Sequence, residues 1–266
     1  IDHTLPGRLG DTLRQSGTHL AAVTAKLHAS EAAANVQART DSLTGLANRT
    51  AALEHLAVLA SQARTGNVSS AVVFLDLDGF KSVNDMQGHG EGDRILGEIG
   101  ARLSAACPNE LVARIGGDEF IVLIDGVSDP DEVTALALRL IDIVSEPCAG
   151  SGGQLFAISA SAGVSFVDGT RDPLDCIAEA DSAVYHAKES GRSRVEVFNA
   201  RLARDIEDRA LMALTMRQGL LDDQFVLKLQ PIIEVATKQP VGAEALLRWN
   251  RPGQGEIGPN DFIPIA

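Results

Sequence analysis

Two short acidic segments contain the residues best suited to chemistry. In FLDLDGFKSVND, Asp76 and Asp78 end an apolar run, and in RIGGDEF, Asp118 and Glu119 follow two glycines. Carboxylate oxygens are the ligands that hard cations such as Mg²⁺ prefer, and these cations often bind phosphates as well. Brought side by side, the two segments would form a site for metal-assisted phosphoryl chemistry.

Both segments also have an ordinary interpretation. LVARI and FIVLI flank GGDE as two short apolar strands, so the two glycines and two acids also fit a tight, solvated hairpin turn. Acids at a strand end, such as Asp76 and Asp78, are common without any metal. Gly116 and Gly117 nevertheless belong to the residue type that lets a backbone approach a nucleotide closely.

The composition limits the class of protein. The chain has 266 residues and a net charge of -13, which argues against general binding to nucleic acid or to a membrane surface, because both use a basic face. An anionic substrate therefore needs a metal ion or a local group of Lys and Arg. The three cysteines lack the spacing of zinc ligands; they are Cys107, Cys148 and Cys176.

The sequence also bears on localisation. No apolar run reaches the roughly 18 residues of a membrane span, and we find no signal peptide. We therefore expect this part of the protein to be cytoplasmic and without membrane contact. Because the first residue is Ile1 and not Met, we interpret the chain as a piece of a longer protein with an upstream sensory region, which could carry a membrane anchor.

The hydrophobic pattern predicts the elements that position the acids. Helices and strands alternate in the order α-β-α-β-β-α-β-α-β, which indicates a mixed α/β (α+β) fold with a central sheet, an antiparallel hairpin within it and flanking helices. The expected helices are 48–63, 90–106, 129–147 and 173–191. The expected strands are 69–78, 111–115, 120–124, 154–167 and 193–198.

We expect four segments along the chain: a linker or signalling helix over 1–40, a domain over 41–199, a linker helix over 200–222 and a further segment over 223–266. The first segment is rich in Ala, Gln, Glu and Leu and has only a thin apolar stripe. A solvated linker helix is the favoured interpretation. The alternative is a signalling helix that pairs with its copy in a dimer.

The GGDE segment resembles the signature of GGDEF-domain diguanylate cyclases. Four further segments match that family in order and spacing: DSLTGLANR, FLDLDGFKSVND, GHGEGD and AVYHAKESGRSRV. The resemblance covers 41 to about 198. It implies a fold similar to the nucleotidyl cyclase and polymerase palm, and a homodimer that condenses two GTP into cyclic di-GMP with release of two pyrophosphates.

The resemblance also implies the site residues. Mg²⁺, or Mn²⁺ in its place, would be held by Asp76, the Leu77 carbonyl, Asp118 and Glu119. The catalytic residues would be Asp118, Glu119 and Lys81, with Asp118 accepting the 3′-hydroxyl proton and Lys81 stabilising the transition state. GTP would contact Phe80, Lys81, Asn84, His89, Asp93, Gly116, Gly117, Lys188 and Arg192.

Within that set, Asn84 and Asp93 would bind the guanine edge, because an amide and a carboxylate can accept from N1–H and N2–H₂. Lys188 and Arg192 would hold the distal phosphates. Taken singly, these residues could also be helix caps or solvated cations at a helix C-terminus. Asp41 and Arg49 are interpreted as structural, as a cap and a salt-bridge partner.

Two features depart from this pattern. Many members of the family carry an inhibitory RxxD motif with five residues between its Asp and the first glycine, but here Cys107 and Glu110 occupy its Arg and Asp positions. Cysteine cannot make the contacts of a guanidinium, so we expect no product inhibition through this surface.

The C-terminal segment 223–266 resembles the start of an EAL-domain phosphodiesterase. Glu244 matches the first metal ligand of that family, and Leu229 replaces its usual Tyr. Because such a barrel needs roughly 250 residues, we expect Glu244 to be an isolated acid here and this chain not to hydrolyse cyclic di-GMP. The alternative to a cyclase is a catalytically silent GTP-binding module that regulates the EAL domain of the longer protein.

Overall fold

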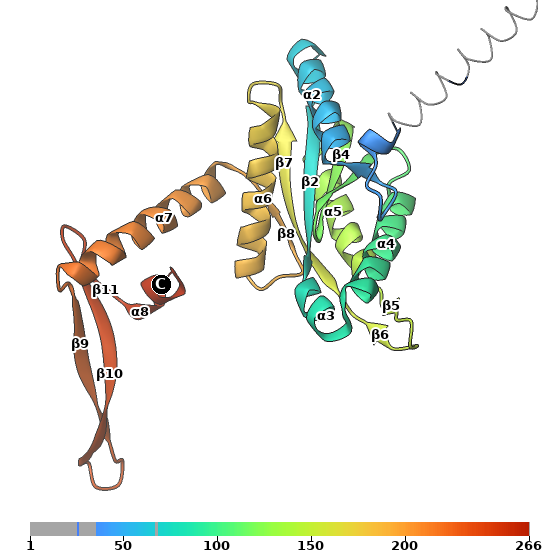
Figure 1. Ribbon diagram of the computed structural model, residues 1–266. Helices are drawn as coiled ribbons and strands as arrows, with labels where there is room; N and C mark the ends of the chain where they lie inside the picture. Colours follow the sequence, from blue (N-terminus) through green and yellow to red (C-terminus); the bar gives the residue numbers. More distant parts are fainter. Residues whose placement is uncertain (1–25, 27–35, 67–68, 266) are drawn as a thin grey trace, which may run out of the picture. The chain divides into compact units, whose positions relative to one another are not determined.

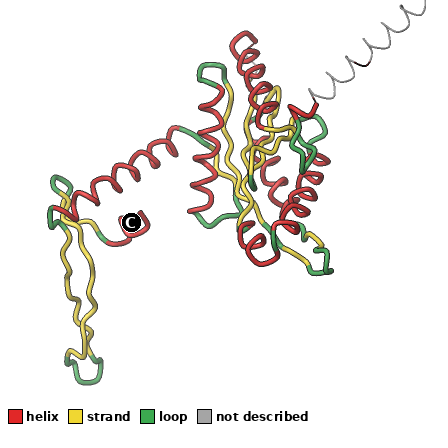
Figure 2. The backbone as a smooth tube through the Cα atoms, in the orientation of Figure 1, coloured by secondary structure: helices red, strands yellow, loops and turns green. Residues whose placement is uncertain are grey.

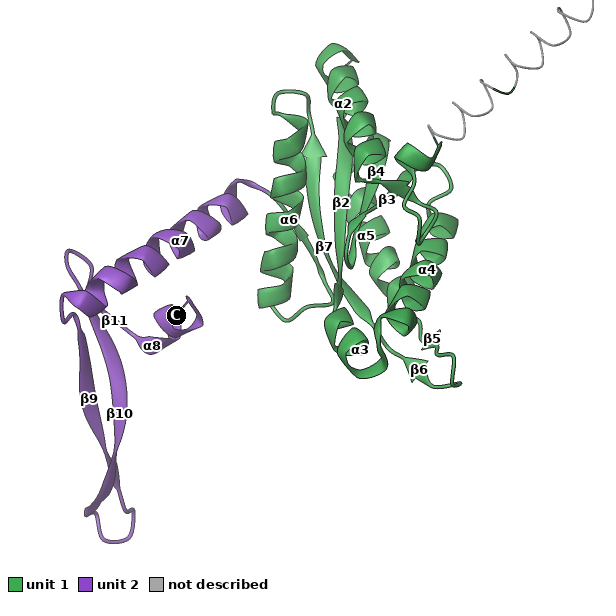
Figure 3. Cartoon of the chain, in the orientation of Figure 1, with its two compact units in different colours: residues 1–198 green, residues 199–266 purple. Residues whose placement is uncertain are grey.

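The computed structural model describes residues 26, 36–66 and 69–265. The chain forms two compact units, Ile1–Phe198 and Asn199–Ala266 (Figure 3). Most of the expected N-terminal linker or signalling helix falls outside the described residues. In the part of the chain that is described, no helix is both long and apolar enough to cross a membrane.

Antiparallel strands form the centre of a sheet in the first unit (Figure 1). The central strand β2 (Ser69–Asp78) pairs with β4 (Glu119–Val127) on one side and with β7 (Ser159–Val167) on the other. β3 (Leu111–Gly116) and β4 form the antiparallel hairpin whose turn contains GGDE. The hairpin expected from LVARI and FIVLI is therefore confirmed.

Two short parallel strands complete the edges of this sheet. β1 (Ala47–Asn48) pairs with β3, and β8 (Val195–Val197) pairs with β7, so the strand order is β1-β3-β4-β2-β7-β8. In Figure 2 the strands of this sheet lie between helices. The expected mixed fold with a central sheet and flanking helices is confirmed.

Helices cover both faces of this sheet, because successive side chains of each strand point to opposite faces. Val73 and Leu75 of β2 join one apolar core, and Val72 and Phe74 join the other. The two longest helices of the first core are α4 (His89–Ala106) and α5 (Pro130–Ser145). Those of the second are α2 (Arg49–Gly66) and α6 (Pro173–Glu189).

The helices begin where capping residues predict. Asn48 Oδ1 accepts a hydrogen bond from the Ala51 N–H at 3.1 Å, at the start of α2. Asp129 and Asp172 accept likewise at the starts of α5 and α6, each followed by a proline in the first turn.

One helix was not expected from the sequence. None of the expected helices covers the segment after β2, but Phe80–Gln87 forms the helix α3. Gly79 has a φ of 78°, which lets the chain turn sharply from the strand into the helix. As a result, α3 begins directly beside the acids at the end of β2.

The expected strand over 154–167 is divided in the structure. Its first part, β6 (Leu155–Phe156), pairs with β5 (Cys148–Ala149) in a small separate hairpin. Only the part from Ser159 onward joins the central sheet as β7. Leu155 is exposed whereas Ile158 is buried in the core, so the chain changes its surroundings between these residues.

The second unit has its own small core. It consists of α7 (Ala200–Leu221), the antiparallel strands β9 (Phe225–Ile233), β10 (Pro240–Arg251) and β11 (Gly255–Ile257), and α8 (Pro259–Phe262), followed by a short 3₁₀ turn. Met216, Trp249 and Phe262 form the buried cluster. Glu244 lies on β10, where it pairs in register with Gln230 and is exposed to solvent.

Candidate functional site

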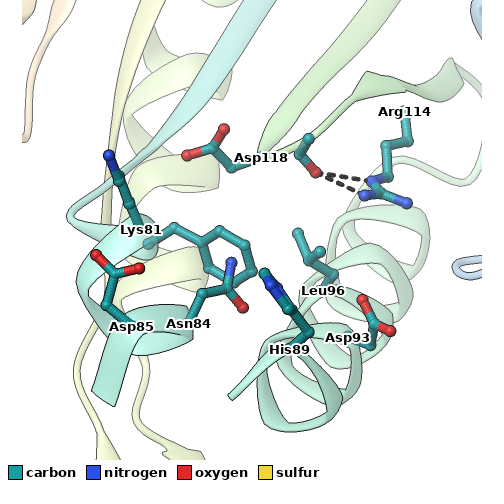
Figure 4. Close-up of a pocket in the computed structure, with 10 residues that line it drawn as sticks. Lys81, Asn84, Asp85, His89, Asp93, Leu96, Arg114 and Asp118 are labelled. Carbon is teal, nitrogen blue, oxygen red and sulfur yellow. Dashed lines mark hydrogen bonds between the residues drawn. The ribbon is translucent and has the colours of Figure 1, made fainter. Parts of the chain in front are cut away.

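A cavity of about 380 Å³ lies where α3, α4 and the GGDE turn meet (Figure 4). Seven of the expected site residues line it: Phe80, Lys81, Asn84, His89, Asp93, Gly117 and Asp118. Asp85, Leu96 and Arg114 line it as well, although the sequence had not identified them as site residues. Gly116 does not line the cavity; it ends β3 and is exposed.

Two neighbouring helices supply the polar side chains of this cavity. Asn84 comes from α3, while His89 and Asp93 come from the first turns of α4. Figure 4 shows the Asn84 amide and the His89 ring close together, with Asp93 beyond them on α4. Among the described residues, the Asn84 amide has no side-chain hydrogen-bond partner, so its donor and acceptor are available to a ligand.

The adjacent acids of the turn face different surroundings. In β4, Phe120 belongs to the core beneath α4 and α5, whereas Ile121 belongs to the core beneath α2 and α6. By the same alternation, Asp118 lines the cavity described above, whereas Glu119 lines a second cavity of about 350 Å³ on the α2–α6 side, together with Arg49 and other residues.

The two acidic segments lie side by side, as the chemistry requires. Asp76 of β2 pairs in register with Glu119 of β4. The Leu77 N–H donates to the Asp118 carbonyl at 3.3 Å, so the backbone joins the end of β2 directly to the GGDE turn. The carbonyl of Leu77 thus belongs to the same junction of strand ends.

Lys188, in the last turn of α6, contacts this junction. Its Nζ lies 2.5 Å from Asp76 Oδ1, yet that oxygen is buried and lacks a hydrogen bond of good geometry within the described chain. Burial raises the pKa of Asp76 above its ordinary value; Lys188 opposes this effect, and Asp118 adds to it by repulsion. Burial also raises the pKa of Glu119, assisted by repulsion from Asp181 and Asp76.

Asp78 has a different role from Asp76. The hydroxyls of Ser159 and Ser161 donate to its carboxylate at 3.0 Å, and the Ser193 N–H donates at 3.2 Å. Arg192 Nε lies 3.9 Å away. Arg192 and Ser193 both have positive φ values, which are costly for residues with side chains. We conclude that Asp78 anchors the loop after α6 and so places Arg192 near the strand ends, a role that the sequence did not reveal.

Arg114 fixes the shape of the turn. Its guanidinium donates to the Gly117 carbonyl through Nε at 3.0 Å and Nη2 at 2.7 Å, shown as dashed lines in Figure 4. It also pairs with Asp41 at 3.2 Å. Asp41 is therefore structural, as expected, and it caps the turn to Thr44. Its ion-pair partner is Arg114; within the described residues, Arg49 has no ion pair with it.

The acids at the strand ends are suited to a divalent cation. Asp76 has a buried carboxylate oxygen without a good hydrogen bond, and the pKa values of Asp76 and Glu119 are raised by burial and by repulsion from neighbouring acids. A bound cation would relieve both effects. Asp76, the Leu77 carbonyl, Asp118 and Glu119 are the groups that could hold it. The described residues contain no ready-made cluster of three or more His, Cys, Asp or Glu side chains that could hold a metal ion, so a cation would have to draw these groups together.

Cys107, which stands where the RxxD motif has its arginine, does not lie on the surface. Cys107 is buried at the end of α4, with only 3% of its surface exposed. Burial raises the pKa of its thiol to about 11. Glu110 accepts from the neighbouring Asn109 N–H.

Comparison with known proteins identifies the relatives of this chain. The diguanylate cyclase GGDEF-domain family matches residues 38–194, and the EAL-domain family matches residues 213–266. The coiled coil and GGDEF domain of DgcB from Caulobacter crescentus, solved with c-di-GMP, has a TM-score of 0.64 at 27% identity, over 73% of this chain and 100% of that one. A sensory box/GGDEF family protein from C. crescentus has a TM-score of 0.54 at 42% identity, over 57% and 99%.

Two curated relatives are named as enzymes of cyclic di-GMP metabolism. The bifunctional diguanylate cyclase/cyclic di-GMP phosphodiesterase MucR of Pseudomonas aeruginosa is 37% identical over 85% of this chain and 33% of MucR. The cyclic di-GMP phosphodiesterase NbdA of the same organism is 38% identical over 86% of this chain and 29% of NbdA. The chain thus spans about a third of the length of these relatives. It belongs to the diguanylate cyclase GGDEF-domain family, and a short EAL-domain segment follows the GGDEF domain.

Proposed function

We propose that the first unit is an active diguanylate cyclase that condenses two GTP into cyclic di-GMP and two pyrophosphates. One observation carries the proposal: the GGDE turn joins the cavity that Asp118 lines to Asp76, a partly buried acid that contacts a lysine. A base-sized cavity next to an acidic and cationic junction is suited to a nucleoside triphosphate.

In this proposal the cavity between α3 and α4 holds the guanine. The Asn84 amide and the Asp93 carboxylate accept from N1–H and N2–H₂ of the base, and His89 closes the same cavity. The ring of Phe80 is buried beneath the cavity and forms part of its floor. An adenine would present different donors to Asn84 and Asp93, so these residues would select guanine.

The phosphates would then extend toward the strand ends. The N-terminus of α3 carries backbone N–H groups without a side-chain cap, and it begins beside Asp76. Lys81 projects from the first turn of α3, while Lys188 and Arg192 approach from the end of α6. Mg²⁺ or Mn²⁺, bound by Asp76, the Leu77 carbonyl, Asp118 and Glu119, would neutralise phosphate charge. Asp118 would accept the 3′-hydroxyl proton, and Lys81 would stabilise the charge of the transition state.

The chemistry requires two copies of the domain. Each holds one GTP, and each 3′-oxygen must attack the α-phosphorus of the opposite GTP in line. Activity per chain should therefore rise with protein concentration, and a fused dimerisation segment should raise it at low concentration.

The test is product formation from GTP and Mg²⁺, measured with the chain as it is and with an enforced dimer. Production of cyclic di-GMP and pyrophosphate in a 1:2 ratio supports the proposal. Binding of GTP without product, even in the enforced dimer, would identify a silent GTP-binding regulatory module instead.

A further inference from the structure

Gly92 lies where α4 passes closest to α3. It is buried in the first turns of α4, directly before Asp93. A Cβ at this position would lie 1.9 Å from Asn84 Oδ1, 2.9 Å from Asn84 Cγ and 3.1 Å from Phe80 Cζ. Real Cβ atoms do not approach other atoms to 1.9 Å, so the Asn84 amide occupies the space that a side chain at residue 92 would need.

We infer that Gly92 is a positioning residue for base recognition: its missing side chain sets the place of the Asn84 amide, and thereby the preference for guanine. This inference rests on the proposed function, because it assigns the cavity between α3 and α4 to the base. Gly92 itself touches no base in this account. It acts through Asn84, whose amide has no other side-chain partner among the described residues to restore its position.

The consequence of a methyl group at residue 92 follows from the geometry. The Asn84 amide is the end of a flexible side chain, so it can rotate away without unfolding the protein, whereas the buried Phe80 ring is held by the core. Rotation would move the Asn84 amide away from the edge of the base, so that only Asp93 would hydrogen-bond to the guanine. The loss of one hydrogen bond corresponds to about tenfold weaker binding of the guanine nucleotide.

The same helix offers a matched control. Gly97 is also in α4, five residues further on, and a Cβ there would meet nothing within 4 Å. Gly92→Ala and Gly97→Ala therefore add the same methyl group and the same gain in helix propensity to one helix. Only Gly92→Ala displaces Asn84.

The experiment measures binding to the full chain, in Mg²⁺, of the non-reacting α,β-methylene analogues of GTP and ATP by calorimetry. We expect Gly97→Ala to bind both analogues like the unsubstituted chain. We expect Gly92→Ala to bind the GTP analogue about tenfold more weakly and the ATP analogue with unchanged affinity. In an Asn84→Ala background, adding Gly92→Ala should cause no further loss. The same variants should show the loss in KM for GTP more than in kcat.

Several results would overturn the inference. One is the same binding of the GTP analogue by Gly92→Ala and Gly97→Ala. Another is an equal weakening of the binding of the GTP and ATP analogues by Gly92→Ala. A third is that Gly92→Ala weakens binding of the GTP analogue as much in the Asn84→Ala background as in the unsubstituted chain. If Gly92→Ala alone does not fold, recovery of the fold by Asn84→Ala supports the contact, and failure to recover refutes it. If the unsubstituted chain shows no preference for guanine, the proposed function fails together with the inference, whereas the other results refute the inference alone.

Discussion

Lys188 Nζ lies 2.5 Å from Asp76 Oδ1, so a lysine of α6 forms an ion pair with an acid near the end of the central strand β2. Asp76 is one of the groups that could hold a divalent metal, and Lys188 is one of the groups proposed to bind phosphate. Under the proposed function, Lys188 and a metal ion would therefore compete for the same carboxylate. Binding of a nucleotide with its metal would transfer Lys188 from Asp76 to the phosphates.

This relationship predicts competition between Lys188 and a metal ion. Lys188→Met should strengthen the binding of Mn²⁺ in the absence of nucleotide by about fivefold, the value of a partly buried ion pair, and should weaken GTP binding. Electron paramagnetic resonance of free Mn²⁺ measures the first effect. The matched control is Lys228→Met, since Lys228 also lies 2.5 Å from a carboxylate, Glu256, but in the second unit. Unchanged or weaker Mn²⁺ binding by Lys188→Met would contradict this account.

The Asp41–Arg114 pair predicts a pH-dependent contribution to stability. Burial acts to raise the pKa of Asp41, but hydrogen bonds from Thr44 and Arg114 outweigh it and hold the pKa below the ordinary value of 3.8. A carboxyl group whose pKa is lowered by folding stabilises the fold at pH values above its ordinary pKa. This stability is lost as the pH falls through the pKa of the folded state. Asp41→Asn should cost about 1–2 kcal/mol at pH 7.

Urea unfolding at a series of pH values measures this difference. The difference in free energy of unfolding between the unsubstituted chain and Asp41→Asn should narrow as the pH falls below 3.8, because Asp41 of the unsubstituted chain then takes up a proton. Asp142→Asn, an exposed position on α5, is the control and should show little change. A gap that stays constant from neutral to acid pH would exclude a role for the charge of Asp41.

Because Cys107 is buried, we predict that cyclic di-GMP does not bind at the surface of residues 107–110, where related proteins carry the RxxD motif. Calorimetric titration with cyclic di-GMP should give the same result for the unsubstituted chain and for Glu110→Ala. Because Cys107 is 3% exposed and its thiol pKa is about 11, iodoacetamide should modify it only after denaturation. Tight binding that is abolished by Glu110→Ala would refute this prediction.

The sequence predicted the parts of the site that depend on strand alternation and local spacing. The apolar run that ends in Asp76 and Asp78, the hairpin around GGDE and the helices that begin near residues 48 and 129 all follow from short-range patterns, and the structure has each of them. The resemblance supplied the residues of the cavity, and seven of them lie together there.

Contacts between distant segments could not be predicted in this way. The helix α3 is only 8 residues long, too short for a clear period of 3.6 residues, and it follows a glycine that indicates a turn. The role of Asp78 depends on hydroxyls of β7 and a backbone N–H after α6, and that of Arg114 on Asp41. Gly92 gave no signal in the sequence, because only the packing of α4 against α3 reveals its contact with Asn84.

The most direct test of the central claim is formation of cyclic di-GMP from GTP and Mg²⁺ by three forms of the enforced dimer: unsubstituted, Asp118→Ala and Asp125→Ala. Asp118 directly precedes β4 and lines the cavity at the GGDE turn. Asp125 lies further along β4, does not line that cavity and pairs with His55. We predict product from the unsubstituted and Asp125→Ala dimers and a loss of at least about a hundredfold for Asp118→Ala. No product from the unsubstituted dimer, or undiminished product from Asp118→Ala, would contradict the account.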